Sequence, residues 1–97
     1  MPDGVVAIND ALGIGLMAGL RQAGVRIPQD ISVIGIDNIP LADLVQPPLS
    51  SVIPPLAEMV KMMINRLLTR IENPDLAPEE FLFAPQLICR QSVVGGD

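Results

Sequence analysis

Two apolar runs decide the fold: VVAIND at residues 5–10 and ISVIGIDN at residues 31–38. Each run ends abruptly in an amide and a carboxylate side chain. Between the runs, leucines recur every four residues, which is the spacing of one face of a helix. Two strands joined by a helix predict neighbouring parallel strands of one sheet. Because ligands of open α/β sheets bind outside the carboxyl ends of the strands, we expect Asn9 and Asp37 side by side at a ligand-binding edge.

The rest of the chain continues the alternation of strand and helix. Asp10 is expected to cap a helix over residues 11–23, and Gly24 is a suitable residue for ending that helix. Further elements are expected at four places: an extended segment at residues 49–53, a helix at 55–71, and short strands at 81–83 and 87–89. This order predicts the α/β class, built from parallel-sheet βαβ units.

The composition excludes several classes of function. The 97 residues include no histidine, which removes Ser-His and Cys-His nucleophile systems and the common zinc sites. Cys89 is the one cysteine, so no internal disulfide can form, and a reducing compartment is indicated. The net charge is −5, with no basic patch for nucleic acid. The uncharged helical run at residues 11–20 is about half the length that crosses a bilayer. We therefore expect no cofactor, no metal, no membrane span, and no DNA binding by these residues alone.

Asn9 and Asp37 have a simpler explanation that must be weighed against ligand binding. Asp37, followed by Asn38 and Pro40, is a good turn former, and an Asn-Asp pair commonly begins a helix. Capping by Asp10 would leave Asn9 without a role, however, and the same pairing recurs after the second strand. An amide beside a carboxylate offers donors and acceptors that suit sugar hydroxyls or a purine edge.

The glycines at residues 13–18 suggest a different function. The run GIGLMA matches the G-x-G-x-x-A fingerprint of dinucleotide-binding enzymes, and Asp37 stands where a ribose-binding acid would follow. The fingerprint needs its first glycine in the turn directly after the strand. Here four residues intervene, so both glycines are expected inside the helix, where they permit close packing. A dinucleotide-binding enzyme fragment remains the less favoured alternative.

Several stretches together resemble the effector-binding core of the LacI/GalR family of bacterial transcription regulators, which shares its fold with periplasmic sugar-binding proteins. The matching stretches are AIND at residues 7–10, LRQAGVRIPQDISVIGIDN at 20–38, PPLSSV at 47–52 and LICRQS at 87–92. The resemblance implies a fragment of a periplasmic-binding-protein-like (type I) fold. It also implies that Asn9 and Asp37 contact a small-molecule effector, and that the helix around Ile14 and the loop from Leu41 to Val45 lie at a homodimer interface.

The resemblance carries further expectations about organisation. Residues 1–53 and 85–97 would form part of a C-terminal subdomain, and residues 54–84 would belong to an N-terminal subdomain. DNA would be bound only through a domain outside these residues, in a cytoplasmic regulator without catalytic activity. A periplasmic sugar receptor is the related alternative. Pro54 departs from relatives that have a polar side chain there. The apolar face of the helix at 55–71 is large enough that we expect a second copy of the chain to cover it.

Overall fold

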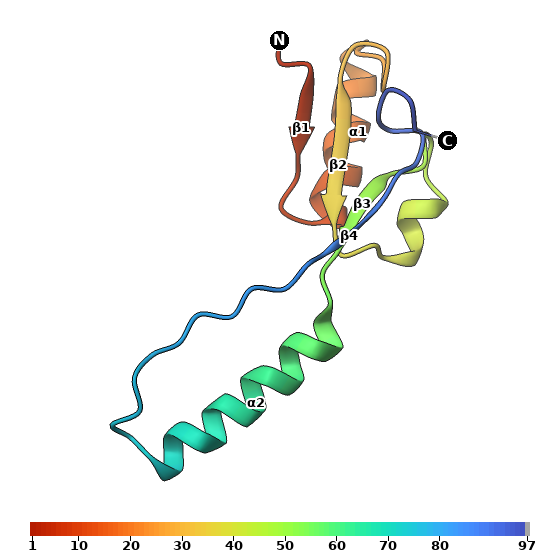
Figure 1. The fold of residues 1–97 in the computed structure, drawn as a ribbon. Helices are drawn as coiled ribbons and strands as arrows, with labels where there is room; N and C mark the ends of the chain where they lie inside the picture. Colours follow the sequence, from red (N-terminus) through yellow and green to blue (C-terminus); the bar gives the residue numbers. More distant parts are fainter. Residues whose placement is uncertain (97) are drawn as a thin grey trace. The chain divides into compact units, whose positions relative to one another are not determined.

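The computed structural model describes residues 1–96 and divides the chain into two compact units (Figure 1). Unit 1 comprises Met1–Ile53 together with the segment that begins at Gln86, and unit 2 comprises Pro54–Pro85. Each unit is described by itself below. Which subdomain of a larger domain each unit represents stays a prediction.

Unit 1 contains a four-stranded sheet. The strands are β1 (Gly4–Val6), β2 (Ser32–Ile36), β3 (Ser50–Ile53) and β4 (Gln86–Ile88), in the order β1-β2-β3-β4. The first three are parallel, which confirms the α/β class, but β4 runs antiparallel to β3. The parallel pairing of β1, β2 and β3 agrees with the predicted βαβ units, and the direction of β4 was not predicted from the sequence. The strand expected at residues 81–83 is wrong, because that segment has no ladder partner and lies in unit 2.

Helix α1 (Asp10–Gln22) connects β1 to β2 and packs on the sheet (Figure 1). The helix stops just before Gly24, as the sequence predicts, because φ is +79° there and glycine adopts that conformation without strain. The Gly24 amide donates to the carbonyl of Arg21, and the Val25 amide donates to that of Leu20. These two bonds form a Schellman motif, which satisfies carbonyls that a helix end leaves free.

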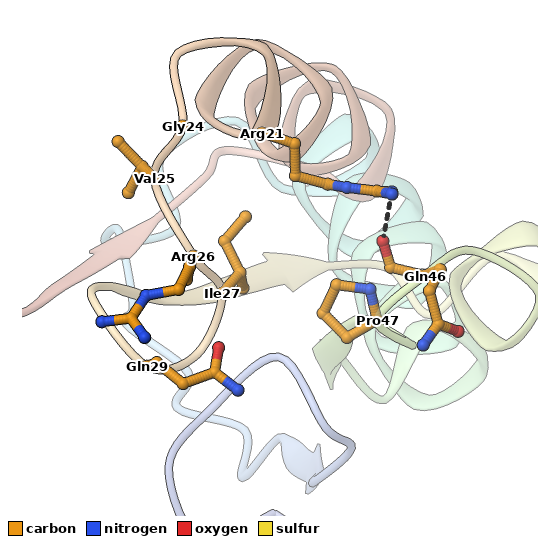
Figure 2. Close-up of a pocket in the computed structure, with 8 residues that line it drawn as sticks. All are labelled: Arg21, Gly24, Val25, Arg26, Ile27, Gln29, Gln46 and Pro47. Carbon is orange, nitrogen blue, oxygen red and sulfur yellow. Dashed lines mark hydrogen bonds between the residues drawn. The ribbon is translucent and has the colours of Figure 1, made fainter.

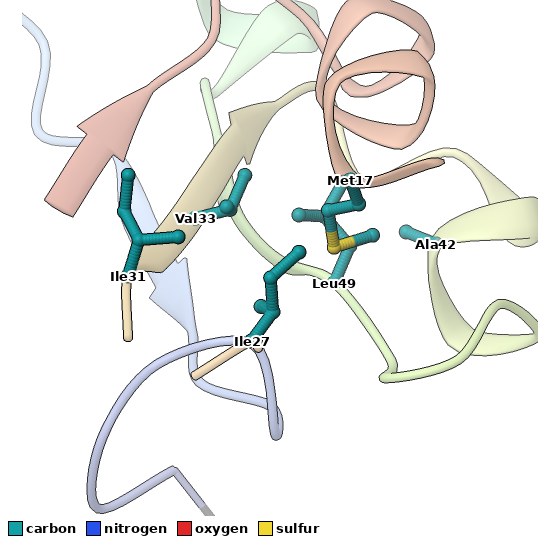
Figure 3. Packing of buried hydrophobic residues seen from close by; sticks show 6 residues of the cluster. All are labelled: Met17, Ile27, Ile31, Val33, Ala42 and Leu49. Carbon is teal, nitrogen blue, oxygen red and sulfur yellow. The ribbon is translucent and has the colours of Figure 1, made fainter. Parts of the chain in front are cut away.

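The core of unit 1 lies between α1 and the sheet (Figure 3). Its buried members are Met17, Ile27, Ile31, Val33, Ala42 and Leu49. Ala42 enters this core from a short 3₁₀ helix (Pro40–Asp43), so the connection between β2 and β3 is not simply a loop. A Cβ placed on Gly13 would lie 3.2 Å from a methyl carbon of Leu49. Gly13 therefore permits the close approach of α1 to the core that its position inside the helix predicts.

Unit 2 consists of helix α2 (Leu56–Glu72) and an extended segment that follows it. None of the residues of α2 is buried. Arg66 connects the two parts: its Nη2 donates to the carbonyl of Ala77 at 2.7 Å, and its guanidinium carbon lies 5.9 Å from the ring centre of Phe81. Across residues 1–96, helices are too short or too polar to cross a membrane.

Candidate ligand-binding site

The candidate site is the edge of the sheet at which β1 and β2 end. We call it the carboxyl rim and define it by Asn9, Asp10 and residues 37–39. Strands β1 and β2 are parallel neighbours, and the bond from the Ala7 amide to the Ile34 carbonyl continues their pairing beyond β1. Asn9 and Asp37 therefore both follow the carboxyl ends of adjacent strands. That they contact one ligand stays a prediction.

Asn9, rather than Asp10, is the N-cap of α1. The Asn9 side-chain oxygen accepts a hydrogen bond from the Leu12 amide at 2.9 Å, and its backbone carbonyl accepts one from Gly13. The prediction that Asp10 caps the helix is therefore wrong by one residue. Both residue types cap well, so the sequence alone did not decide between them. The cap uses only Oδ1 of Asn9, and the two hydrogens on Nδ2 remain donors for another partner.

Asp10 is fully buried and has a different role. Its Oδ1 accepts a hydrogen bond from the Ser51 hydroxyl at 2.7 Å, and its Oδ2 accepts one from the Ile39 amide at 2.8 Å. The carboxylate lies directly over Gly35 of β2, where any Cβ would overlap Oδ1 of Asp10. Asp10 thus connects the start of α1 to β3 and to the segment that follows β2. Its position at the start of a helix also favours a negative charge there.

The backbone that follows β2 is fixed at three successive amides. The Asp37 amide donates to the Val52 carbonyl at 2.8 Å, and the Asn38 amide donates to Oγ of Ser51 at 2.9 Å. The third bond is the one from Ile39 to Asp10. Asp37 and Asn38 have φ values of 112° and 59°, in the left-handed region that costs side-chain-bearing residues about 1 kcal/mol or more. Because these bonds hold the backbone, they fix the position from which the exposed Asp37 side chain extends.

Arg90 is a site residue that the sequence reasoning missed. Its Nη2 donates to Oδ1 of Asn38 at 2.7 Å, its Nη1 donates to the Leu49 carbonyl at 2.6 Å, and its Nε lies 3.4 Å from the Asp43 carboxylate. The Arg90 side chain is only 15% exposed. The motif that contains Arg90 was recognised, but no spacing in the sequence connects residue 90 to residue 38. Only the position of β4 beside β3 reveals the contact.

The dinucleotide interpretation is wrong, because Gly13 and Gly15 both lie inside α1. A phosphate-binding fingerprint would need Gly13 in the turn between β1 and the helix, with its amide directed at the phosphates. Instead, the Gly13 amide donates to the carbonyl of Asn9 as the first bond of the helix. Among residues 1–96, no group of three or more His, Cys, Asp or Glu side chains could hold a metal ion.

A hollow of about 370 Å³, lined by polar and apolar residues alike, lies away from the carboxyl rim (Figure 2). It is formed where α1 ends and where the connections into β2 and β3 pass, so it belongs to the opposite, amino edge of the sheet. Figure 2 shows Arg21 reaching across to donate to the Gln46 carbonyl at 2.7 Å. Ligands of open α/β sheets bind at the other edge, so this hollow is not the candidate site.

Two of the three predicted interface residues, Ile14 and Val45, lie beside one another on unit 1. Ile14 and Val45 are half-buried, pack against the core, and line a shallow hollow of about 180 Å³. Leu41 in the 3₁₀ helix is 49% exposed. The positions show apolar surface next to the core. The partner that would cover it stays a prediction.

Comparison with known proteins shows the family to which the chain belongs. Residues 1–93 match the family model of the periplasmic binding protein-like domain. The chain is 37% identical over 92 residues to the ribose operon repressor of Haemophilus influenzae, and 41% identical over 92 residues to the HTH-type transcriptional repressor PurR of Vibrio atlanticus. Each alignment covers 95% of this chain and 28% of the repressor. The chain thus spans little more than a quarter of the length of these relatives.

Solved structures give the same result. The chain is similar to the transcriptional regulator CelR in complex with cellobiose, with a TM-score of 0.77 and 32% identity over 93% of this chain and 28% of that one. It is also similar to a LacI-family regulator from Enterococcus faecalis with bound ribose, with a TM-score of 0.72 and 40% identity over 93% of this chain and 34% of that one. The chain belongs to the family of periplasmic binding protein-like domains. Within that family it resembles part of the effector-binding domain of LacI-type regulators, as its sequence motifs predicted.

Proposed function

We propose that these residues are the effector-binding portion of a transcriptional regulator, without catalytic activity of its own. The observation that carries the proposal is the carboxyl rim. Adjacent parallel strands deliver Asn9 and Asp37 to one edge of the sheet, and the backbone behind Asp37 is held by three hydrogen bonds. An open α/β sheet binds its ligand at this edge. Similarity to repressors supports a role in transcription control.

The proposed effector is a sugar or a similarly polar small molecule. The Asp37 carboxylate can accept hydrogen bonds from two neighbouring hydroxyls, and Nδ2 of Asn9 can donate to a hydroxyl or ring oxygen. Similar structures hold ribose or cellobiose, which agrees with this chemistry. Unit 2 would belong to a second subdomain, and a ligand between subdomains would shift a hinge equilibrium. It can do so only through different affinities for the two hinge states. DNA would be bound by a domain outside these residues, in the cytoplasm.

Calorimetric titration of the full-length protein with ribose, cellobiose and sucrose tests the site. We expect at least one sugar to bind, and Asp37→Asn to weaken that sugar by about 10- to 100-fold, because a hydrogen bond to a charged group contributes about 1.5–3 kcal/mol. Asparagine tolerates the left-handed backbone, so the variant keeps the fold. The matched control is Asp3→Asn, which neutralises an exposed carboxylate just before β1, at the opposite edge. Equal sugar affinities of the Asp37→Asn and Asp3→Asn variants would show that Asp37 does not contact the ligand.

We also propose that Ile14, Leu41 and Val45 form part of a homodimer interface. Apolar side chains beside the core support this, because a partner surface would remove them from water. Sedimentation of Leu41→Arg should show monomers at concentrations where the unmodified protein is dimeric. Val94→Arg, at an apolar residue of the C-terminal segment that is 76% exposed, is the control and should leave the dimer intact. A dimer that survives Leu41→Arg would place the interface elsewhere.

A further inference from the structure

A buried polar relay lies directly behind the candidate site. Asp10 and Ser51 are both fully buried, and the Ser51 hydroxyl bonds to Oδ1 of Asp10 on one side and to the Asn38 amide on the other. A carboxylate can only accept, so the Ser51 proton must be directed at Asp10. An oxygen lone pair of Ser51 is then free to accept from the Asn38 amide. Asp10 therefore determines that Ser51 donates to the carboxylate and accepts from Asn38.

Ser51 and Asp10 accept hydrogen bonds from the amides of Asn38 and Ile39, which directly follow Asp37. Asp37 and Asn38 both have positive φ, a conformation that persists only where the surroundings determine it. Losing either acceptor would leave a partly buried amide unpaired and release the segment from its left-handed conformation.

We propose that Asp10 and Ser51 are positioning residues that hold the Asp37–Asn38 backbone left-handed, so that the Asp37 carboxylate meets the ligand in one orientation. This inference rests on the proposed function of Asp37. Neither residue touches the ligand, and both act through the backbone. A ligand that binds a preformed site loses less free energy to ordering the protein, so releasing this segment weakens binding.

Strand β3 provides a matched control one residue away. Ser50 is also fully buried, and its hydroxyl also makes two hydrogen bonds, but both are to the backbone of Arg90, two residues beyond β4. Ser50→Ala and Ser51→Ala therefore remove the same group from the same strand at the same burial. They differ in which backbone loses its partner. In Ser51→Ala it is Asn38 itself; in Ser50→Ala it is Arg90, whose side-chain bonds to Asn38 and Leu49 do not involve Ser50.

The test measures amide exchange and sugar affinity in the full-length protein. Ser51→Ala should speed hydrogen exchange at Asn38 and Ile39 by at least about 10-fold relative to Ser50→Ala, while both variants lower the unfolding midpoint similarly. Affinity for the sugar that binds in the titration above should fall about 10-fold or more in Ser51→Ala and less than about 3-fold in Ser50→Ala. Asp10→Asn keeps the shape of the side chain but presents donors to Ser51, and should act in the same direction if Ser51→Ala fails to fold.

The outcomes separate this inference from the proposed function. If Asp37→Asn weakens binding but the Ser51 and Asp10 variants bind like Ser50→Ala, the relay has only a structural role and the inference is overturned. If Asp37→Asn binds like the unmodified protein, the site itself is wrong. Faster exchange at residues 38 and 39 together with weaker binding supports both.

Discussion

Unit 1 buries many of its apolar side chains, whereas helix α2 of unit 2 leaves its apolar side chains exposed. In unit 1, helix α1 and the sheet share one core, in which Val33 and Leu49 are completely removed from water. In unit 2, helix α2 buries none of its residues, and Leu67, for example, is 60% exposed. Sequence periodicity identified the apolar face of both helices equally well. Periodicity therefore shows which face of a helix is apolar but does not show what covers that face.

The polar groups differ in the same way. Unit 1 has a buried network in which Asp10, Ser50, Ser51 and Ser92 all have hydrogen-bond partners. Unit 2 relies on Arg66, whose ion pair with Glu79 is long at 3.9 Å and exposed to water. Exposed ion pairs contribute little to stability. Unit 1 therefore contains the residues that determine its own structure, whereas the contacts within unit 2 contribute little to its stability.

The largest effect should come from truncating the core of unit 1. Leu49→Ala should lower the free energy of unfolding by about 2–5 kcal/mol, because it leaves a cavity beside Met17 and Gly13. The same truncation in α2, Leu67→Ala, should change it by about 0.5 kcal/mol or less, because an exposed leucine loses little. Urea unfolding followed by circular dichroism measures both. Comparable losses in the two variants would mean that α2 is covered, and the contrast between the units would fail.

Two glycines of α1 and its cap should respond in opposite directions. Gly24→Ala should destabilise unit 1 by about 1–2 kcal/mol, because φ is +79° there. Gly15→Ala should stabilise it by about 0.5–1 kcal/mol, since Gly15 lies in the helix with open space around its Cα, where alanine is preferred. Thermal unfolding of both variants provides the measurement. A destabilising Gly15→Ala would show that the exposed side of α1 is in contact with a partner.

The smallest effect concerns a surface ion pair of unit 1. Hydrogen bonds from the Arg26 side chain and then its backbone lower the pKa of Asp30 below its ordinary value of 3.8. A lowered pKa adds stability above the unfolded-state value and loses it as pH falls through the folded-state value. Asp30→Asn should therefore lower the unfolding midpoint slightly at pH 6, and the difference should shrink below about pH 4. A difference independent of pH would exclude the charge as its cause.

Much of unit 1 could be predicted because local signals and the tertiary structure agree there. The apolar runs became β1 and β2, and Gly24 ended the helix where its freedom at positive φ was needed. The placement of Gly13 inside α1 also followed from counting residues after the strand. These features depend on neighbours in the chain, which the sequence displays directly.

The interior of the candidate site could not be predicted, because it depends on residues that are distant in the chain. Nothing near Asp10 in sequence shows that it bonds to Ser51 rather than capping α1. The antiparallel direction of β4 was missed for the same reason, since it depends on where the chain returns after unit 2. Arg90 reaches Asn38 only because of that return.

The pairing of Ile53 with Gln86 means that the chain leaves unit 1 and re-enters it at facing positions of one antiparallel ladder. A two-residue Asn-Gly turn is the connection that such a pair of strands prefers. Splicing Ile53 to Gln86 through that turn would convert β3 and β4 into an ordinary hairpin and delete the exposed helix. The result would be a minimal α/β module, small enough for complete assignment by solution spectroscopy, in which the backbone of the carboxyl rim could be studied in isolation.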